Sequence, residues 1–169
     1  SAPQARAKHA AVYDSQHDRM IVFGGRCFDA CCSDGAVPND VWMLPLGSGT
    51  AQWAEVRPSG VAPPVSLGPA AIHDPVRDRL LVPGASGHVW QLALASAPAW
   101  SEIVPAGIPP TSALAAIYDS AHDRLLVVAS TGRVYHAAFS PDGSRLVTTG
   151  EKGSVILWDA TTGELQLAL

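Results

Sequence analysis

The chain has 169 residues, a length that fits one or two ordinary domains. Hydrophobic residues make up 47% of it and charged residues only 15%, which excludes an intrinsically disordered chain. The formal net charge of −4 argues against a basic face that would bind nucleic acid. No apolar run approaches the roughly 18 to 20 residues that span a bilayer, and residues 1–6 lack the apolar core of a signal peptide. We therefore expect a soluble protein.

Three segments of the chain repeat one pattern, in which an apolar strand ends in Asp and Asp-Arg opens a second apolar strand. Each copy is expected to form two short strands joined by a tight polar turn. The first Asp of each copy should accept hydrogen bonds from backbone N–H groups two residues on. The Arg should pack its stem and leave its head in water. The repeated residues are Asp14, Asp18 and Arg19, then Asp74, Asp78 and Arg79, then Asp119, Asp123 and Arg124.

A third strand is predicted after each pair, at 40–44, 88–92 and 133–137, and a fourth at 53–56 and 100–103. Four short antiparallel strands per unit, at a spacing of about 45 residues, are typical of a β-propeller blade. Tryptophans recur at matched strand positions, where we expect them to pack blades rather than stack on sugars. They are Trp42, Trp90 and Trp158, with Trp53 and Trp100 on the fourth strands.

The first three units resemble the kelch family over roughly residues 6–135. The resemblance rests on Gly24-Gly25 after an apolar strand, on Asn39-Asp40-Val41-Trp42, and on Trp53 before a link rich in Gly and Pro. It implies a kelch-like blade over 6–65 with an inserted loop at 26–38, a second blade over 66–110, and a truncated unit over 111–135. The glycine pair becomes Pro83-Gly84 in the second unit and Ala129-Ser130 in the third.

Residues 136–169 resemble a WD-repeat blade. The resemblance rests on the hairpin Ser140-Pro141-Asp142-Gly143 and on the pair Trp158-Asp159. Only 21 positions separate Arg124 from Arg145, about half a blade, so the third strand of the truncated unit should double as the first strand of the last. Recombination between two propeller families, natural or engineered, would produce this junction.

We predict an all-β protein: one β-propeller over 1–169, built from four-stranded antiparallel sheets, with about 3.5 to 4 blades per chain. Propellers usually close at four to eight blades. Three and a half blades leave open strand edges, which favour pairing with another chain. The chain should either self-associate or form part of a larger ring, and a compressed four-bladed monomer is the alternative.

The polar residues favour a turn role over catalysis, so we expect no enzyme, no cofactor and no metal. His17 and His122 occupy the same place in the repeated turn, and His88 and His136 flank third strands. No His-Glu-x-x-His pattern and no nucleophile elbow occur. The repeated carboxylates would resemble a hydrolase pair, but a catalytic pair is expected once per molecule.

The loop after the first hairpin holds Cys27, Cys31 and Cys32. We favour a disulfide from Cys27 to Cys31 or Cys32 over a metal site, because the histidines are distant in sequence. A disulfide would favour an extracytoplasmic location. The loop departs from the repeat, which makes it the best candidate surface for a partner. The candidate binding residues are Arg26, Asp29, Asp34, Asn39 and Asp40.

The function expected from both resemblances is a non-catalytic scaffold for protein–protein interaction, by analogy of fold alone. Its partner would be another protein or a further copy of the chain that completes the ring, with no nucleic acid and no membrane involved. Two alternatives stay open at this point: a chimeric propeller without a natural ligand, and a propeller that binds or acts on carbohydrate.

Overall fold

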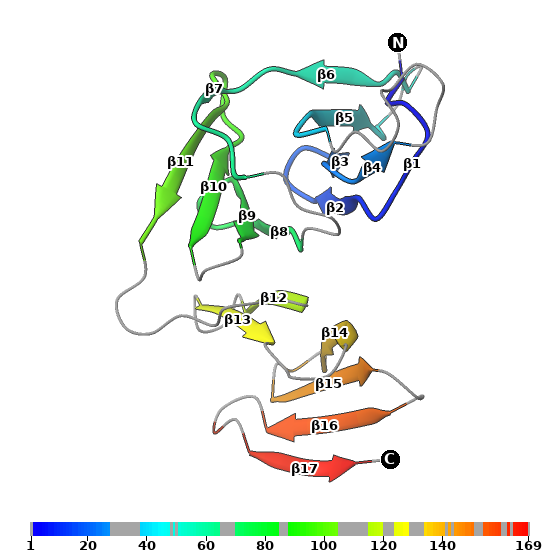
Figure 1. Cartoon of the computed structure of the whole chain (residues 1–169), viewed down its shortest axis with the longest axis vertical. Coiled ribbons are helices and arrows are strands. Elements are labelled where there is room, and N and C mark those ends of the chain that lie inside the picture. The colour runs from blue at the N-terminus through cyan, green and yellow to red at the C-terminus, as the bar shows by residue number, and fades with distance from the viewer. Residues whose placement is uncertain are drawn as a thin grey trace.

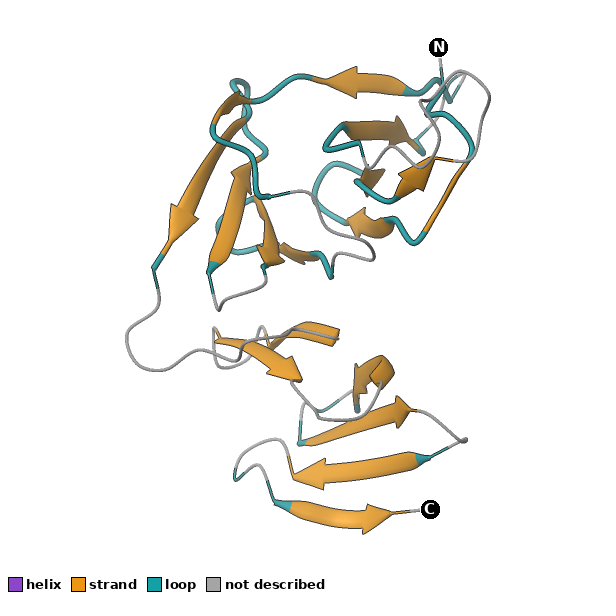
Figure 2. Cartoon of the chain, viewed as in Figure 1, coloured by secondary structure: helices purple, strands orange, loops and turns teal. Residues whose placement is uncertain are grey.

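The computed structural model describes most of the chain, with gaps that fall mainly between strands. The described residues are 2–27, 38–47, 49, 51–64, 70–84, 88–104, 115–119, 124–128, 134–140, 142, 144–150, 154–159, 162, 164 and 165–168. For 115, 124–128, 134–136 and 139 only the backbone is described. Every regular element in these residues is a β-strand, so the predicted all-β class is confirmed (Figure 2).

The first sheet has four antiparallel strands in the order β2-β3-β5-β6. They span Ala10–Asp14, Arg19–Phe23, Val41–Pro45 and Ala54–Val56. These segments form strands because branched and aromatic side chains fit a pleated, half-buried surface. Beside this sheet, the short strand β1 (Arg6–Ala7) pairs with β4 (Arg26–Cys27), which brings the start of the described chain to the start of the cysteine loop.

The second sheet has five strands in the order β7-β11-β10-β9-β8. Strands β8 (Ile72–Asp74), β9 (Arg79–Pro83), β10 (Val89–Ala93) and β11 (Ala99–Ile103) are antiparallel. The short strand β7 (Ser59–Gly60) runs parallel to β11 at the sheet edge. It comes from the link after the first sheet, so this link is tied to the outer edge of the second.

The third sheet holds two described strands, β12 (Ala115–Asp119) and β13 (Arg124–Val128). The fourth has the antiparallel order β14-β15-β16-β17, over Val134–Phe139, Arg145–Gly150, Val155–Asp159 and Leu165–Ala168. Strand β14, which the sequence assigns to both the third and the last unit, pairs with β15 in the fourth sheet.

The four sheets follow one another in chain order, with their first strands in sequential contact. Strand β2 lies against β8, β8 against β12, and β12 against β14. Figure 1 shows the first two sheets side by side, with the third and the fourth below them. The second and third sheets therefore each lie between a preceding and a following sheet.

The best-defined core lies between the first and second sheets. Side chains of β3 and β5 meet side chains of β9 and β10, because alternate residues of each strand point to the same face. The ring of Phe23 packs on Trp100 with the centroids 5.2 Å apart. The buried cluster consists of Ile21, Phe23, Val41, Met43, Leu80, Val82, Leu92, Leu94 and Trp100. No described helix is long and apolar enough to cross a membrane.

Candidate functional site

The repeated turn is built around its first Asp. The buried Oδ1 of Asp14 accepts hydrogen bonds from the backbone N–H groups of Gln16 and His17, at 3.1 and 3.2 Å. Asp74 accepts from Val76 and Arg77 in the same way, at 3.0 and 3.2 Å. Asp14 and Asp74 therefore accept the backbone hydrogen bonds that the repeat predicts for the turn.

In the first and second turns the arginine binds the same carboxylate. Nε of Arg19 donates to Oδ2 of Asp14 at 2.6 Å, and Nε of Arg79 donates to Asp74 at 2.7 Å. The expectation that these heads lie in water is wrong, because a buried carboxylate requires a charged partner. Burial alone would raise the pKa of Asp14, but hydrogen bonds from Arg19 and His17 outweigh it and hold the pKa below its ordinary value.

The second Asp of the turn adopts a left-handed backbone, with φ at 46° in Asp18 and 48° in Asp78. Asp tolerates this region better than most residues. The conformation lets each carbonyl accept a hydrogen bond from the residue after the third strand, Leu46 at 2.8 Å and Leu94 at 3.0 Å. The turn thus connects three strands of its sheet by hydrogen bonds, and both of its Asp residues have a structural role in it.

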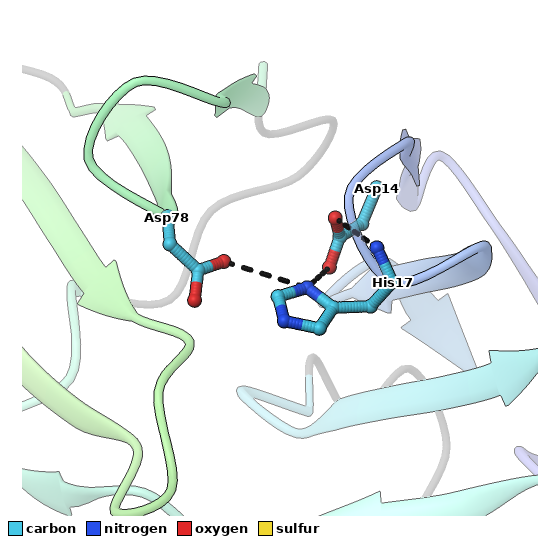
Figure 3. A group of neighbouring side chains, drawn as sticks. All are labelled: Asp14, His17 and Asp78. Atoms are coloured by element: carbon cyan, nitrogen blue, oxygen red, sulfur yellow. Dashed lines mark hydrogen bonds and ion pairs between the residues drawn. The ribbon is translucent and has the colours of Figure 1, made fainter.

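Polar side chains gather where the turn of the first sheet meets the second sheet (Figure 3). Nδ1 of His17 lies 2.9 Å from Oδ2 of Asp14 and 3.7 Å from Oδ1 of Asp78. Nε2 of His73, on β8, lies 3.4 Å from Oδ1 of Asp14. We call these four residues the first junction. The ligand atoms of Asp14, His17 and Asp78 all lie within 4.8 Å of one another, close enough to share an ion.

Two atoms of the first junction lack hydrogen bonds. Among the buried side-chain polar atoms of the described residues, only Nε2 of His73 and Oδ1 of Asp78 have no such partner. An unsatisfied buried polar atom costs about 1 to 3 kcal/mol. Sequence reasoning did not single out His73, although its place in the repeat, shared with Tyr118, was a usable signal.

The next junction, between the second and third sheets, uses different side chains at the same repeat positions. Tyr118 takes the place of His73 and donates a hydrogen bond to Asp74, and this bond lowers the pKa of that carboxyl. Burial is the largest influence on Asp74 and raises the pKa, but Arg79 and the other donors outweigh it. Arg77 takes the place of His17, with Nη1 at 3.4 Å from Oδ2 of Asp74.

Two of the candidate binding residues at the ends of the cysteine loop, Asn39 and Asp40, form hydrogen bonds within the fold. The guanidinium of Arg6 binds Asp40, with Nη2 at 2.8 Å from Oδ2, and also donates to the carbonyl of Gly24. Asn39 donates to the carbonyl of Pro63. Arg26 is exposed, whereas Asp29 and Asp34 lie outside the described residues. A role for these five residues in binding stays a prediction.

Of the three cysteines, only Cys27 lies in the described part of the chain. Cys27 is buried and disulfide-bonded, and its sulfur lies 3.4 Å from Oε1 of Gln4. Cys31 and Cys32 lie outside the described residues, so the choice between them stays a prediction.

The repeated tryptophans lie where they can pack. Trp42 is buried, and its Nε1 donates to Oδ2 of Asp40 at 2.6 Å. Trp90 packs against the core cluster. Trp158 donates to Oγ1 of Thr148 at 2.9 Å within the fourth sheet. Of the third turn, Asp119 is buried, whereas Asp123 and the side chain of Arg124 lie outside what is described.

Comparison with solved structures identifies the fold as a β-propeller. The chain is similar to the β-propeller domain of Myceliophteria thermophila Cps50 (Swd1), with a TM-score of 0.52 at 10% sequence identity. The match covers 90% of this chain but 55% of that one, so the chain spans about half the length of the propeller that it matches. No protein-family model matches the chain, and no curated protein matches it.

Proposed function

We propose that the chain is a non-catalytic scaffold for protein–protein interaction, and that its first partner is a second copy of the same chain, which completes the ring. The observation that carries this proposal is that both ends of the stack of sheets present surfaces equivalent to those buried between the first and second sheets.

The face that a sheet turns to the next sheet is seen in the first sheet. There Ile21 pairs with Met43 across β3 and β5, and both are buried in the core shared with the second sheet. The same register in the fourth sheet pairs Val147 with Leu157, and Leu157 with Leu167. Residues directly opposite one another share a face of the sheet. This row is only partly buried, and Leu167 is 47% exposed.

The face that a sheet turns to the preceding sheet is seen in the second sheet. It carries His73, Leu80 and Leu92, and both leucines are fully buried. The matching row of the first sheet is Tyr13, Met20 and Leu44. Tyr13 is 54% exposed, and its hydroxyl donates to Asp18 of its own turn. Tyr118, at the same place in the third sheet, instead donates to Asp74 of the preceding sheet.

By repeat position, the open face of the fourth sheet corresponds to the face that the first sheet buries, and the open face of the first sheet corresponds to the face that the second sheet buries. The two open faces therefore complement each other, which favours a head-to-tail contact between copies. Size supports the same arrangement, because the chain spans 55% of the propeller that it resembles. Two copies would supply about one full ring. The turn carboxylates support a non-catalytic role, since Asp14 and Asp74 each accept hydrogen bonds from backbone N–H groups and from an arginine of the same turn.

Light scattering coupled to size-exclusion chromatography tests this proposal on the 169-residue chain. We expect a mass of twice 17.6 kDa at micromolar concentration. Because the contact is apolar, the mass should persist in high salt. A stable monomer over the whole concentration range would overturn the proposed self-association.

A further inference from the structure

The first junction has one fixed positive charge fewer than the described part of the second. The second junction places the fixed cation of Arg77 beside Asp74, together with Arg79. The first junction places an imidazole, His17, at the same repeat position beside Asp14, together with Arg19. The carboxylate of Asp78 also faces His17. Two carboxylates thus face one guanidinium in the first junction, whereas the described groups of the second junction set two guanidiniums around Asp74, so the first has a deficit of fixed positive charge by comparison.

Two atoms of the first junction that lack hydrogen-bond partners indicate that a bound cation could supply the missing positive charge. Nε2 of His73 forms no hydrogen bond with any described residue, its side chain is 7% exposed, and it lies 3.4 Å from Oδ1 of Asp14. The buried Oδ1 of Asp78 is likewise unpartnered and faces Nδ1 of His17. A metal ion is bound by atoms that offer it a lone pair, and imidazole nitrogens and carboxylate oxygens are such atoms. Unpartnered atoms of these two kinds, close together, are therefore what a metal site requires.

The spacing of the ligand atoms fits one small cation. Zinc binds imidazole nitrogen and carboxylate oxygen at about 2.0 to 2.2 Å, so two ligand atoms of a tetrahedral site lie about 3.4 Å apart. Nδ1 of His17 lies 2.9 Å from Asp14 and 3.7 Å from Asp78, on either side of this value (Figure 3). The His17 side chain is 46% exposed, which leaves the site a path for entry.

We propose that the first junction binds one divalent transition-metal ion of the zinc class, held by His17, Asp78 and Asp14 with His73 at its edge. Imidazole and carboxylate ligands together favour Zn²⁺, Co²⁺, Ni²⁺ or Cu²⁺ over the hard cations Mg²⁺ and Ca²⁺. The ion would join the turn of the first sheet to that of the second. It would thus take the place that the guanidinium of Arg77 occupies in the second junction.

The test is a titration of the metal-free chain, without a histidine tag, with Zn²⁺ in a calorimeter and with Co²⁺ in a visible spectrometer. We expect one ion per chain, d–d absorption of bound Co²⁺, and no competition from millimolar Mg²⁺. His17→Asn and Asp78→Asn should each weaken Zn²⁺ binding about tenfold or more. His88→Asn should leave it unchanged, because His88 binds Glu102 on the surface of the second sheet.

A second variant separates metal binding from folding. His17→Arg installs the pattern of the second junction, so it should abolish Zn²⁺ uptake while the circular dichroism spectrum and thermal midpoint remain those of the metal-free wild type or better. The proposal is overturned if the wild type takes up no Zn²⁺. It is equally overturned if uptake survives in both His17→Asn and His17→Arg, since the ion would then lie on other histidines. Binding of Ca²⁺ as tight as that of Zn²⁺ would contradict the assigned class.

Discussion

A single carboxylate organises the repeated turn in each of the first two sheets. Asp74 accepts two backbone N–H groups, the guanidinium of Arg79 and the hydroxyl of Tyr118 from the next sheet. A buried charge is tolerated only when it is paired and hydrogen-bonded, and here both requirements are met. The residue therefore fixes the turn and the contact between sheets at the same time.

Substitution of Asp74 should be strongly destabilising. Asp74→Ala removes the carboxylate that pairs with the part-buried Arg79 and leaves it only the neutral acceptor of Gln91, and breaking a buried pair costs about 3 to 5 kcal/mol. The free energy of unfolding in urea measures this loss. Asp142→Ala is the matched control, since that exposed turn carboxylate bonds only its neighbours Ser140 and Ser144 among the described residues. Equal midpoints for the two variants would contradict the role assigned to Asp74.

Two turn carboxylates and Asp40 contribute to the response of the fold to acid. The pKa values of Asp14, Asp40 and Asp74 are all held below the ordinary value of 3.8, because their donors outweigh the effect of burial. A lowered folded-state pKa contributes stability above the unfolded value, and that stability is lost as the pH falls through the folded value. We expect the free energy of unfolding to decline below about pH 4, and less steeply in Asp74→Asn.

At the residue scale, the repeat in the sequence predicts the turn and its Asp, because these contacts are local. The ion pair of Arg19 is equally local, because Asp14 lies directly opposite it across the hairpin. The repeat does not predict the position of His73, which depends on how one sheet stacks on another. His73 becomes informative only when it is aligned with Tyr118 of the next unit.

At the element scale, the glycine pair after β3 is explained by a strand that the sequence does not reveal. Gly24 and Gly25 have φ of 64° and 95°, a region that favours glycine. A Cβ on Gly25 would lie 2.9 Å from the carbonyl oxygen of Ala7, because β1 passes beside it to pair with β4. Strands of two residues carry no alternation of apolar and polar positions, so neither β1 nor β7 could be predicted from the pattern.

Gly25→Ala should therefore weaken the first sheet. The left-handed backbone and the close approach of Ala7 and His9 add strain of about 1 to 3 kcal/mol, measured as a fall in the free energy of unfolding. Gly84→Ala is the control, because Gly84 also follows the second strand of its sheet, at the place of Gly24, and its backbone N–H donates to the carbonyl of His88 as that of Gly24 donates to Asp40. Its nearest contact, the carbonyl oxygen of His88, is 3.4 Å away, and its φ is not in the left-handed region. We expect a much smaller effect there, and the reverse ranking would refute this account.

At the scale of the whole molecule, the sequence predicts the all-β class, and the structural comparison confirms the propeller. The number of blades in the closed ring does not follow from the pattern, because ring size depends on the angle at which neighbouring sheets stack. The kelch and WD resemblances and the domain limits stay predictions. The structure adds that the stack of sheets has two different ends. The partly exposed face of the fourth sheet that carries Leu167 corresponds to the face that the first sheet buries against the second.

This direction can be tested by mixing two variants, each blocked on one face. Tyr13→Glu charges the open face of the first sheet, and Leu165→Glu with Leu167→Glu charges β17 of the fourth, where both leucines are exposed. Two copies joined head to tail share two identical contacts, so each variant alone loses both and should be monomeric.

Mixed in equal amounts, the variants retain one intact contact between the fourth sheet of one chain and the first sheet of the other. Light scattering should then show dimers that neither variant forms alone, and mass spectrometry should find one copy of each variant in them. Contacts between equivalent faces give a different result, because an isologous pairing through β17 would be lost in the leucine variant but kept in Tyr13→Glu. A dimer of Tyr13→Glu alone would therefore reject the head-to-tail arrangement.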